Sequence, residues 1–288
     1  MFQPSGLSLQ RPAHQRVDGA ARIAYRRDAQ GATRLADLYQ RAPCRVLFPD
    51  VEAGEPAQAV MLTTSGGLTG GDRLALQIEA GEGTRLTVTT QAAEKLYRAL
   101  PGDEATRIDI RVSVGDGAWA EWLAQETILF DRSKLRRCFV ADVAPTGRLL
   151  AVESLVFGRT AMGEAVASGS LHDAWRIRRG GRLVWADALQ LQGEVGEQRA
   201  RPFGFGTARA CASLVYVGED AAALLPPLRE RLQGCADRVA ATAFDGLLIV
   251  RVLAEDAADM RMAVRIAAGA LRALAAGLPE RLPNDWDC

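Results

Sequence analysis

The segment from Met61 to Leu74 contains four glycines within six positions, namely Gly66, Gly67, Gly70 and Gly71. Glycines at this density indicate a backbone with positive φ angles, or one that passes close to another part of the chain. A Walker-type phosphate loop would end in Gly-Lys-Ser/Thr and lead into a helix, and a dinucleotide-binding loop would also precede a helix. Here Asp72 follows, and then an apolar alternation from Leu74 to Ile78 that is typical of a strand. The segment therefore predicts a tight turn between two strands.

The charge of the chain is balanced, because 35 Lys and Arg residues stand against 35 Asp and Glu residues among its 288 residues. A zero net charge gives no electrostatic footprint for nucleic acid or anionic lipid. No apolar run reaches the roughly 18 residues that a membrane-spanning helix needs, and residues 1–21 show no signal-peptide pattern. The sequence therefore predicts a cytoplasmic protein that binds neither nucleic acid nor membrane.

Cysteine and histidine are few and scattered. The five cysteines are Cys44, Cys138, Cys211, Cys235 and Cys288. They form no C-x-x-C pair, which argues against a disulfide framework and a zinc ribbon. The two histidines, His14 and His172, lie outside any nucleophile motif, so the sequence indicates no catalytic triad.

From about Arg45 to Leu191 the residue pattern is that of β-strands throughout. Apolar or β-branched residues alternate in the segments 59–63, 74–78, 86–90 and 108–114. Clusters of Gly, Asp and Pro separate them, and Gly180-Gly181 between 175–177 and 183–185 predicts a hairpin. Many short strands at short spacing predict a mainly β body, which is a sandwich, a barrel or a β-helix.

The pattern changes in residues 207–288. We therefore expect a β-rich body over 1–206 and a small α+β portion over 207–288 packed on it, so that the two form one continuous structural unit. Residues 213–217 predict a strand, and 225–232 a short helix with Pro226-Pro227 in its first turn. Residues 239–244 and 247–253 predict a hairpin around Asp245-Gly246. The last helix is the clearest, with Asp256 as its N-cap and Gly277 at its end.

Three stretches together carry a resemblance to a known family. They are 63–72, which holds the four glycines; 86–98, which ends in Glu94-Lys95-Leu96-Tyr97-Arg98; and 122–133, which contains Gln125 and ends in Asp131-Arg132-Ser133. With 40–45 and 281–283, and in the same order along the chain, they resemble the urease accessory protein family UreD, which is called UreH in some organisms. The combination of these motifs is specific for the family, although each motif alone would be weak evidence for it.

The resemblance implies a fold and a function. It implies a β-helix-like body of two sheets with few helices, and a chaperone rather than an enzyme. Members bind apo-urease and recruit UreF and, through it, the GTPase UreG during nickel insertion. The resemblance implies no permanently bound cofactor, transient contact with nickel, and a passage for that metal, and it leaves a dimer within the accessory complex open.

Asp72, Glu153 and Glu164 are the expected nickel-path residues, the last two because they match family segments with internal carboxylates. Glu153 lies among apolar residues. A carboxylate that points inward there is energetically costly unless it is paired or meets a cation or water. If the strand simply alternates, Glu153 points to solvent instead. Glu164 follows a glycine in an expected loop, where a solvated carboxylate without a role is common. Isolated carboxylates suit weak, transient nickel ligation better than storage.

Two other functions stay open from sequence. In one, the chain is an enzyme of phosphate or sugar processing that uses Gly66–Asp72 as an anion nest, with Lys95 and Asp131 as polar groups. In the other, it is a structural scaffold that never touches metal. Lys95, Tyr97 and Arg98 either contact a partner or close over the Gly-rich loop, or Tyr97 is a residue at the edge of the core and the charges beside it lie in water. Trp119 and Trp122 cannot share one face of a strand, so we expect one of them to be available to a partner.

Overall fold

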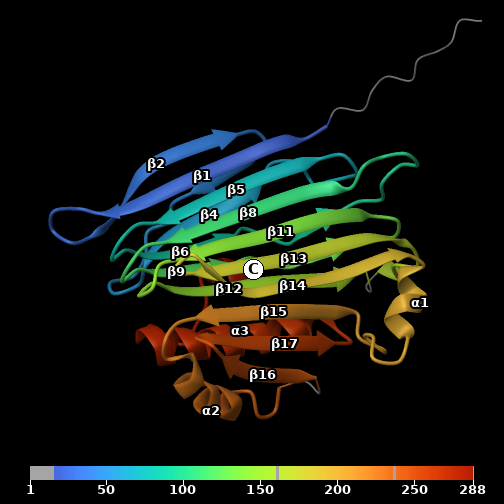
Figure 1. The fold of residues 1–288 in the computed structure, drawn as a ribbon. Helices are drawn as coiled ribbons and strands as arrows, with labels where there is room; N and C mark the ends of the chain where they lie inside the picture. The colour runs from blue at the N-terminus through green and yellow to red at the C-terminus, as the bar shows by residue number, and fades with distance from the viewer. Residues whose placement is uncertain (1–15, 160–161, 236–237, 288) are drawn as a thin grey trace, which may run out of the picture.

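Two β-sheets packed face to face make up most of the molecule (Figure 1). The structure is a computed structural model that describes residues 16–159, 162–235 and 238–287. The first sheet has seven strands, in the order β14 (Arg182–Gly193), β13 (Gly169–Arg179), β11 (Lys134–Val143), β8 (Thr106–Val114), β5 (Arg73–Ala80), β1 (Asp18–Arg27) and β2 (Thr33–Arg41). The second has ten, in the order β16 (Val239–Phe244), β17 (Leu247–Ala254), β15 (Ala210–Val217), β12 (Arg148–Phe157), β9 (Trp119–Leu123), β6 (Arg85–Thr90), β4 (Ala57–Thr63) and β3 (Cys44–Leu47), with β10 (Thr127–Leu129) beside β12 and β7 (Glu94–Leu96) beside β10.

The chain winds between the two sheets as in a β-helix. From β4 onward, successive long strands alternate between the second and the first sheet, up to β13. Strands two steps apart therefore become neighbours, and β5, β8, β11 and β13 pair in parallel, as do β4, β6, β9 and β12. Parallel neighbours need a crossover connection, and here the crossover is a strand of the other sheet. The expectation of a mainly β, β-helix-like body of two sheets is confirmed.

The turns follow the chemistry that the sequence predicts. The hairpin between β13 and β14 turns at Gly180 and Gly181, whose φ angles are +54° and +78°. The hairpin between β16 and β17 turns at Asp245 and Gly246, with φ angles of +47° and +75°. Two consecutive positive φ angles are what a primed two-residue turn requires. Each predicted strand segment lies within or coincides with an observed strand.

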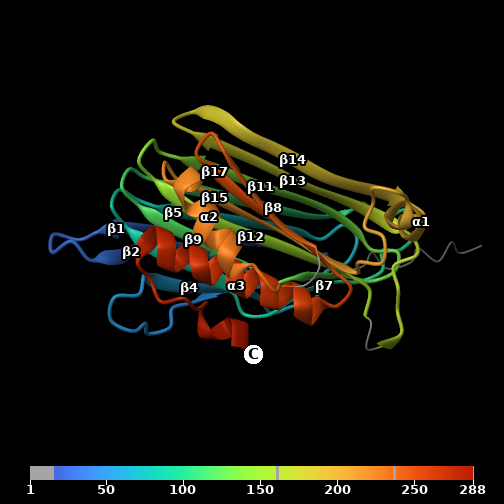
Figure 2. The same cartoon turned by 90° about the horizontal axis from the view of Figure 1, so that it is seen from below.

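Two hydrophobic cores share the second sheet as a common wall. The first core fills the space between the sheets and includes Val88, Phe139, Leu149 and Ile177. The second core lies on the opposite face of the second sheet, where helices α2 (Ala221–Arg231) and α3 (Ala257–Ala276) cover it (Figure 2). This explains why β12 is buried along nearly its whole length, whereas strands of the first sheet alternate between buried and exposed positions.

Helix α3 forms as the sequence predicts. The Asp256 side chain accepts a hydrogen bond from the Ala258 N–H at 2.7 Å, and Gly277 ends the helix at φ +62°. Its buried face packs on the second sheet, and the buried guanidinium of Arg272 donates to Glu121 at 2.9 Å and to Glu55 at 2.6 Å. This contact fixes the helix to the sheet through a charged pair as well as through apolar area.

Helix α2 starts earlier than predicted. It begins at Ala221, so Pro226 and Pro227 lie inside the helix and not in its first turn. Proline in a helix interior removes backbone hydrogen bonds. The helix forms all the same because Leu224 and Leu228 are buried in the second core. Two further short helices are α1 (Val195–Ala200) and the 3₁₀-helix η2 (Asn284–Asp287).

The two tryptophans of β9 point to opposite faces of the second sheet, as their spacing predicts. Trp122 belongs to the core between the sheets, and Trp119 to the core beneath α3. The expectation that one of them is available to a partner is wrong, because each is only 2% exposed. His172 lies on β13, and His14 lies outside the described residues. Among the helices of the described ranges, none is long and apolar enough to cross a membrane.

Candidate functional site

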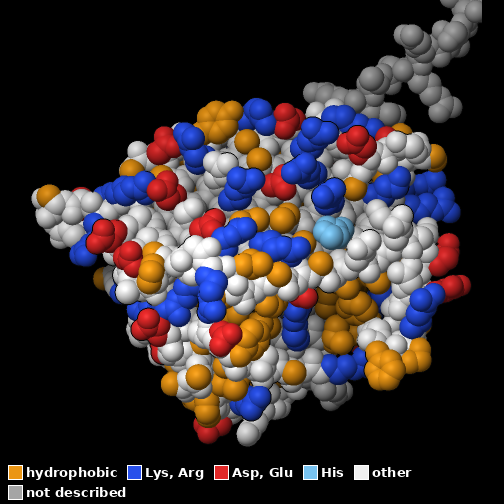
Figure 3. All heavy atoms as spheres, in the orientation of Figure 1, with side chains coloured by type: hydrophobic (Ala, Val, Ile, Leu, Met, Phe, Trp, Pro, Cys, Tyr) orange, Lys and Arg blue, Asp and Glu red, His pale blue; other side chains and the backbone are white. Residues whose placement is uncertain are grey.

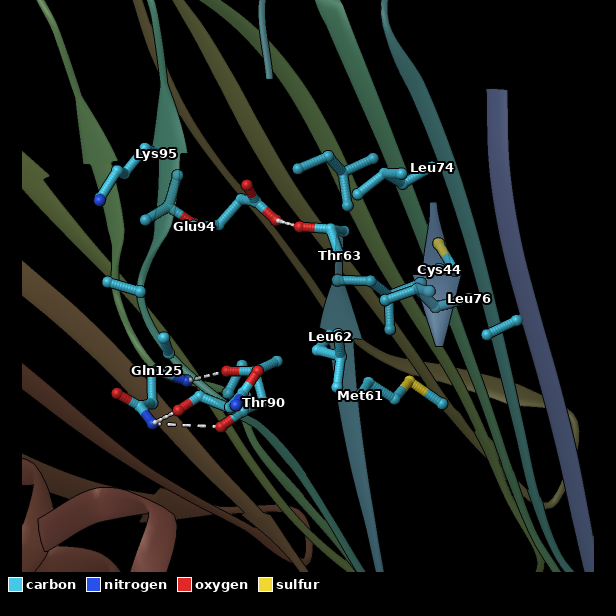
Figure 4. A pocket seen from close by; sticks show the side chains of 18 of the residues that line it. Cys44, Met61, Leu62, Thr63, Leu74, Leu76, Thr90, Glu94, Lys95 and Gln125 are labelled. Carbon is cyan, nitrogen blue, oxygen red and sulfur yellow. Dashed lines mark hydrogen bonds between the residues drawn. The ribbon is translucent and has the colours of Figure 1, made fainter. Parts of the chain in front are cut away.

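A cavity of about 210 Å³ lies between the two sheets, near the end of β4 (Figure 4). The second sheet is interrupted here, because β6 stops at Thr90 before β7 begins at Glu94, and β9 stops at Leu123 before β10 begins at Thr127. The first sheet contributes apolar residues such as Leu74, and the second sheet contributes most of the polar wall. The wall residues that form side-chain hydrogen bonds or ion pairs include Thr63, Glu94, Trp122, Gln125, Arg137 and Glu153.

The Gly-rich loop lines one side of this cavity through Gly66 and Gly67. The Tyr97 hydroxyl donates to the Gly66 carbonyl at 2.7 Å, and a Cβ at position 67 would lie 2.5 Å from the Tyr97 ring. Gly67 also has φ +144°, so this position needs glycine for both reasons. Tyr97 therefore closes over the loop, which is one of its predicted roles.

Three backbone N–H groups of the Gly-rich loop donate within the protein. The N–H of Leu68 bonds to the Lys95 carbonyl, the N–H of Thr69 bonds to the Asp72 carboxylate, and the N–H of Asp72 bonds to the Thr69 carbonyl. An anion nest needs several free N–H groups that point to one place. The loop geometry therefore does not favour the phosphate- or sugar-processing alternative.

Asp72 holds the loop together rather than facing the cavity. Its carboxylate accepts from the N–H groups of Val17 and Thr69, both at 2.8 Å, and its side chain is buried. Asp131 has a similar role, because it accepts from the N–H groups of Ala167 and Ser168, both at 3.0 Å. These two carboxylates join loops that are distant in sequence.

Glu153 points inward, so the alternative that it faces solvent is excluded. It is 4% exposed, its Oε1 accepts from Trp122 Nε1 at 2.8 Å, and its Oε2 pairs with the Arg137 guanidinium. Arg137 also makes a bidentate contact with Asp173, at 2.8 and 2.7 Å. Burial, together with the charge of Asp173, raises the pKa of Glu153 to about 7 against the opposing effects of Arg137 and Trp122. Both oxygens of Glu153 thus have partners.

Glu94 is the second carboxylate in the cavity, and it was not among the site residues expected from the sequence. Its Oε2 accepts from the Thr63 hydroxyl at 3.1 Å (Figure 4). Within the described ranges no Lys or Arg forms an ion pair with Glu94. Burial raises its pKa from the usual 4.5 to about 7, and the charge of Asp72 adds to this effect. Alternation in β7 could have identified it, because Glu94 shares a face with the buried Leu96.

The remaining predicted residues lie around the cavity or away from it. Gln125 closes one side, because its amide donates to the carbonyls of Thr90 at 3.1 Å and Asp285 at 2.8 Å. Lys95 and Arg98 have exposed side chains. Glu164 lies in a loop outside the cavity, where it pairs with Arg159 at 2.6 Å. Of the three carboxylates expected on a nickel path, only Glu153 is part of the cavity wall.

Sulfur is present in the wall but is poorly suited to bind metal. Cys44 is buried beside the cavity, and burial followed by the charge of Glu94 raises the pKa of its thiol to about 11. A metal-binding thiol must lose its proton. In residues 16–159, 162–235 and 238–287, no group of three or more His, Cys, Asp and Glu side chains is arranged to hold a metal ion.

The fold and the cavity define a mainly β protein whose two sheets enclose a largely apolar space with two carboxylates in its wall. Residues 17–287 match the family described as UreD urease accessory protein. The chain belongs to this family.

Curated relatives match over almost their whole length. Urease accessory protein UreD of Magnetococcus marinus is 42% identical over 278 residues, which cover 95% of each chain. The UreD protein of a Methylobacterium species is 42% identical over 280 residues, 96% of each chain. The UreD protein of Rhizobium leguminosarum bv. trifolii is 42% identical over 273 residues, 95% of this chain and 96% of the relative.

Proposed function

We propose that this protein acts in the maturation of urease as a non-catalytic chaperone in the cytoplasm. It binds apo-urease and recruits UreF and, through UreF, UreG, and its cavity passes nickel toward the urease active site. Family membership supports the maturation role. The observation that supports passage of a cation is the cavity between the sheets, whose wall carries the carboxylates of Glu94 and Glu153.

The ligand set suits transient binding. Ni²⁺ held by several imidazoles and thiolates would be released slowly, whereas isolated oxygen ligands bind it weakly. The cavity wall offers carboxylate and hydroxyl oxygens, and its one thiol is kept protonated by burial. Nickel is the cargo in this proposal, and the chain keeps no resident cofactor.

The two carboxylates have different parts in the proposal. Glu153 is already paired with Arg137 and Trp122, and a dication beside the Arg137 guanidinium would be repelled. Glu94 has only a neutral hydroxyl as its side-chain partner in the described residues. We therefore assign the first contact with the cation to Glu94, and we keep Glu153 as a charged part of the wall. Asp72 and Glu164 remain predictions without a place in the cavity.

The test measures nickel per urease active site after co-production of urease with UreF, UreG and this chain. Omitting the chain should abolish nickel loading. Glu94→Gln should lower loading several-fold at limiting nickel, while the complex with UreF still forms. Glu82→Gln is the matched control, because Glu82 is exposed and lies at the opposite end of the strands. Undiminished loading without the chain would refute the maturation role, and undiminished loading with Glu94→Gln would refute the assignment of Glu94.

The scaffold alternative makes a different prediction in the same experiment. A chain that only positions UreF would give full loading with Glu94→Gln and with Glu153→Gln, as long as the complex forms. Loss of loading with an intact complex is therefore the result that separates a passage from a scaffold.

A further inference from the structure

The outer face of the first sheet carries a strip of small side chains between two rows of basic ones. Strand register places the short side chains of Ala75, Asp109, Cys138 and Ala174 side by side on neighbouring strands. Ala174 is buried, and the Asp109 carboxylate pairs with Arg107 of the flanking row. The first flanking row consists of Arg73, Arg107, Arg136 and His172. The second flanking row contains Arg22, Arg111 and Arg176, and Arg22 lies two strands away from Arg111. We call this surface the Arg-flanked strip.

This face has no covering layer in the described structure. Helices α2 and α3 both lie on the second sheet, and Figure 3 shows Lys and Arg side chains gathered across the middle of the uncovered face. Parallel sheets are usually covered on both faces. An uncovered, largely parallel sheet with charged side chains is therefore a surface that a partner can occupy.

The arrangement of the arginines is unfavourable without a partner. Neighbouring strands lie about 4.8 Å apart, so Arg73, Arg107 and Arg136 stand abreast with like charges on adjacent strands. Arg73 and Arg107 have acidic neighbours, Glu104 at 3.4 Å and Asp109 at 2.6 Å. The first pair is well exposed and the second is partly exposed, and exposed pairs contribute little. The row thus keeps its attraction for an anionic partner.

The spacing of the two rows indicates the shape of that partner. Arg107 and Arg111 lie four residues apart on β8, which is about 13 Å along a strand. An α-helix with its side chains is about 10–12 Å wide. A helix that crosses the strands would rest on the small residues and place both of its flanks beside basic side chains. The five strands from β1 to β13 span about 19 Å, which matches roughly 13 helical residues.

We propose that the Arg-flanked strip is a docking site for a helix of a protein partner, with acidic residues on both flanks and small residues in the centre. This assignment rests on the charge and spacing of the strip and does not depend on the nickel passage. The electrostatic complementarity would mainly accelerate association and make it sensitive to salt.

The first experiment uses a synthetic helical peptide of about 14 residues, with Ala in the centre and Glu on both flanks, in fluorescence polarisation at low salt. The full chain should bind it, and Arg107→Glu combined with Arg136→Glu should weaken binding at least tenfold. Arg182→Glu combined with Arg201→Glu is the control, because both arginines are exposed and lie outside the strip. A matched peptide with Lys in place of Glu should not bind.

Three results would overturn the proposal. The first is that the wild-type chain does not bind the peptide. The second is that the Arg107→Glu, Arg136→Glu variant binds it as tightly as the wild type. The third is that duplex RNA or anionic vesicles at equal charge concentration fully displace the peptide. A photo-reactive residue at Ala75, which is exposed, then identifies the natural occupant among purified apo-urease and UreF. A cross-link to an acidic helical segment supports the assignment, whereas a cross-link confined to loop segments contradicts it.

Discussion

Replacing Glu94 by Gln should stabilise the protein, and the gain should depend on pH. The half-buried side chain of Glu94 lines the cavity, and desolvation raises the pKa of its carboxyl group from 4.5 to about 7. The difference corresponds to about 3 kcal/mol, because one pH unit is worth about 1.4 kcal/mol. Gln has the same shape, and it can still accept from the Thr63 hydroxyl.

The direction of this pH dependence follows from the pH at which the folded and the unfolded chain each release the Glu94 proton. Below pH 4.5 the carboxyl group is protonated in both the folded and the unfolded chain, so wild type and variant should be equally stable. As the pH rises toward 7, the unfolded chain loses the proton first, and the wild-type protein loses stability that the variant keeps. Above pH 7 the difference should level off at about 3 kcal/mol in favour of the variant.

Urea denaturation followed by tryptophan fluorescence, at several pH values from 4.5 to 8, measures this difference. If Ni²⁺ makes its first contact at Glu94, added Ni²⁺ should stabilise the wild-type protein at pH 7.5 and leave Glu94→Gln unchanged, because a ligand that binds only the folded state stabilises it. If the difference in the free energy of unfolding between the two proteins is the same at every pH, burial does not raise the pKa of Glu94. Equal stabilisation of both by Ni²⁺ would refute the role of Glu94 as a ligand.

Three other perturbations test the framework around the cavity. Arg137→Met leaves two buried carboxylates without their cation and should lower the free energy of unfolding by about 3–5 kcal/mol, and an unchanged urea midpoint would contradict this. Gly67→Ala should cost about 1–3 kcal/mol because its Cβ would meet the Tyr97 ring at a positive φ, and Tyr97→Ala should restore part of the loss in thermal unfolding. Gln125→Leu removes the hydrogen bond to the Asp285 carbonyl, so limited proteolysis should cut the C-terminal segment faster than in wild type.

The interior charges connect the two sheets. Arg137 and Asp173 belong to the first sheet, and Glu153 belongs to the second, so their network crosses the space between the sheets. Such a network is a poor source of net stability, because desolvation opposes the attraction between the charges. Its position at the inner wall of the cavity suggests instead a role in fixing the shape and polarity of that space.

Local patterns in the sequence predicted most of the elements. Alternation predicted the strands around Leu74 and Leu86, and the N-cap at Asp256 and the glycine at 277 predicted α3. These predictions succeed because each depends on the conformational preferences of a few neighbouring residues. The start of α2 was missed because burial of Leu224 outweighs the local effect of the two prolines.

The mainly β character of the chain and its turns can be predicted from the amino-acid sequence alone, and the motifs around Gly66, Tyr97 and Asp131 indicate its family. Which carboxylates share a cavity, and which are already paired, depends on how the strands pack in three dimensions. Glu94, Glu153 and Arg137 are far apart along the chain, and they meet because alternate strands return to opposite walls of one space. The arginines of the Arg-flanked strip become neighbours for the same reason, since parallel pairing aligns residues that no local pattern connects.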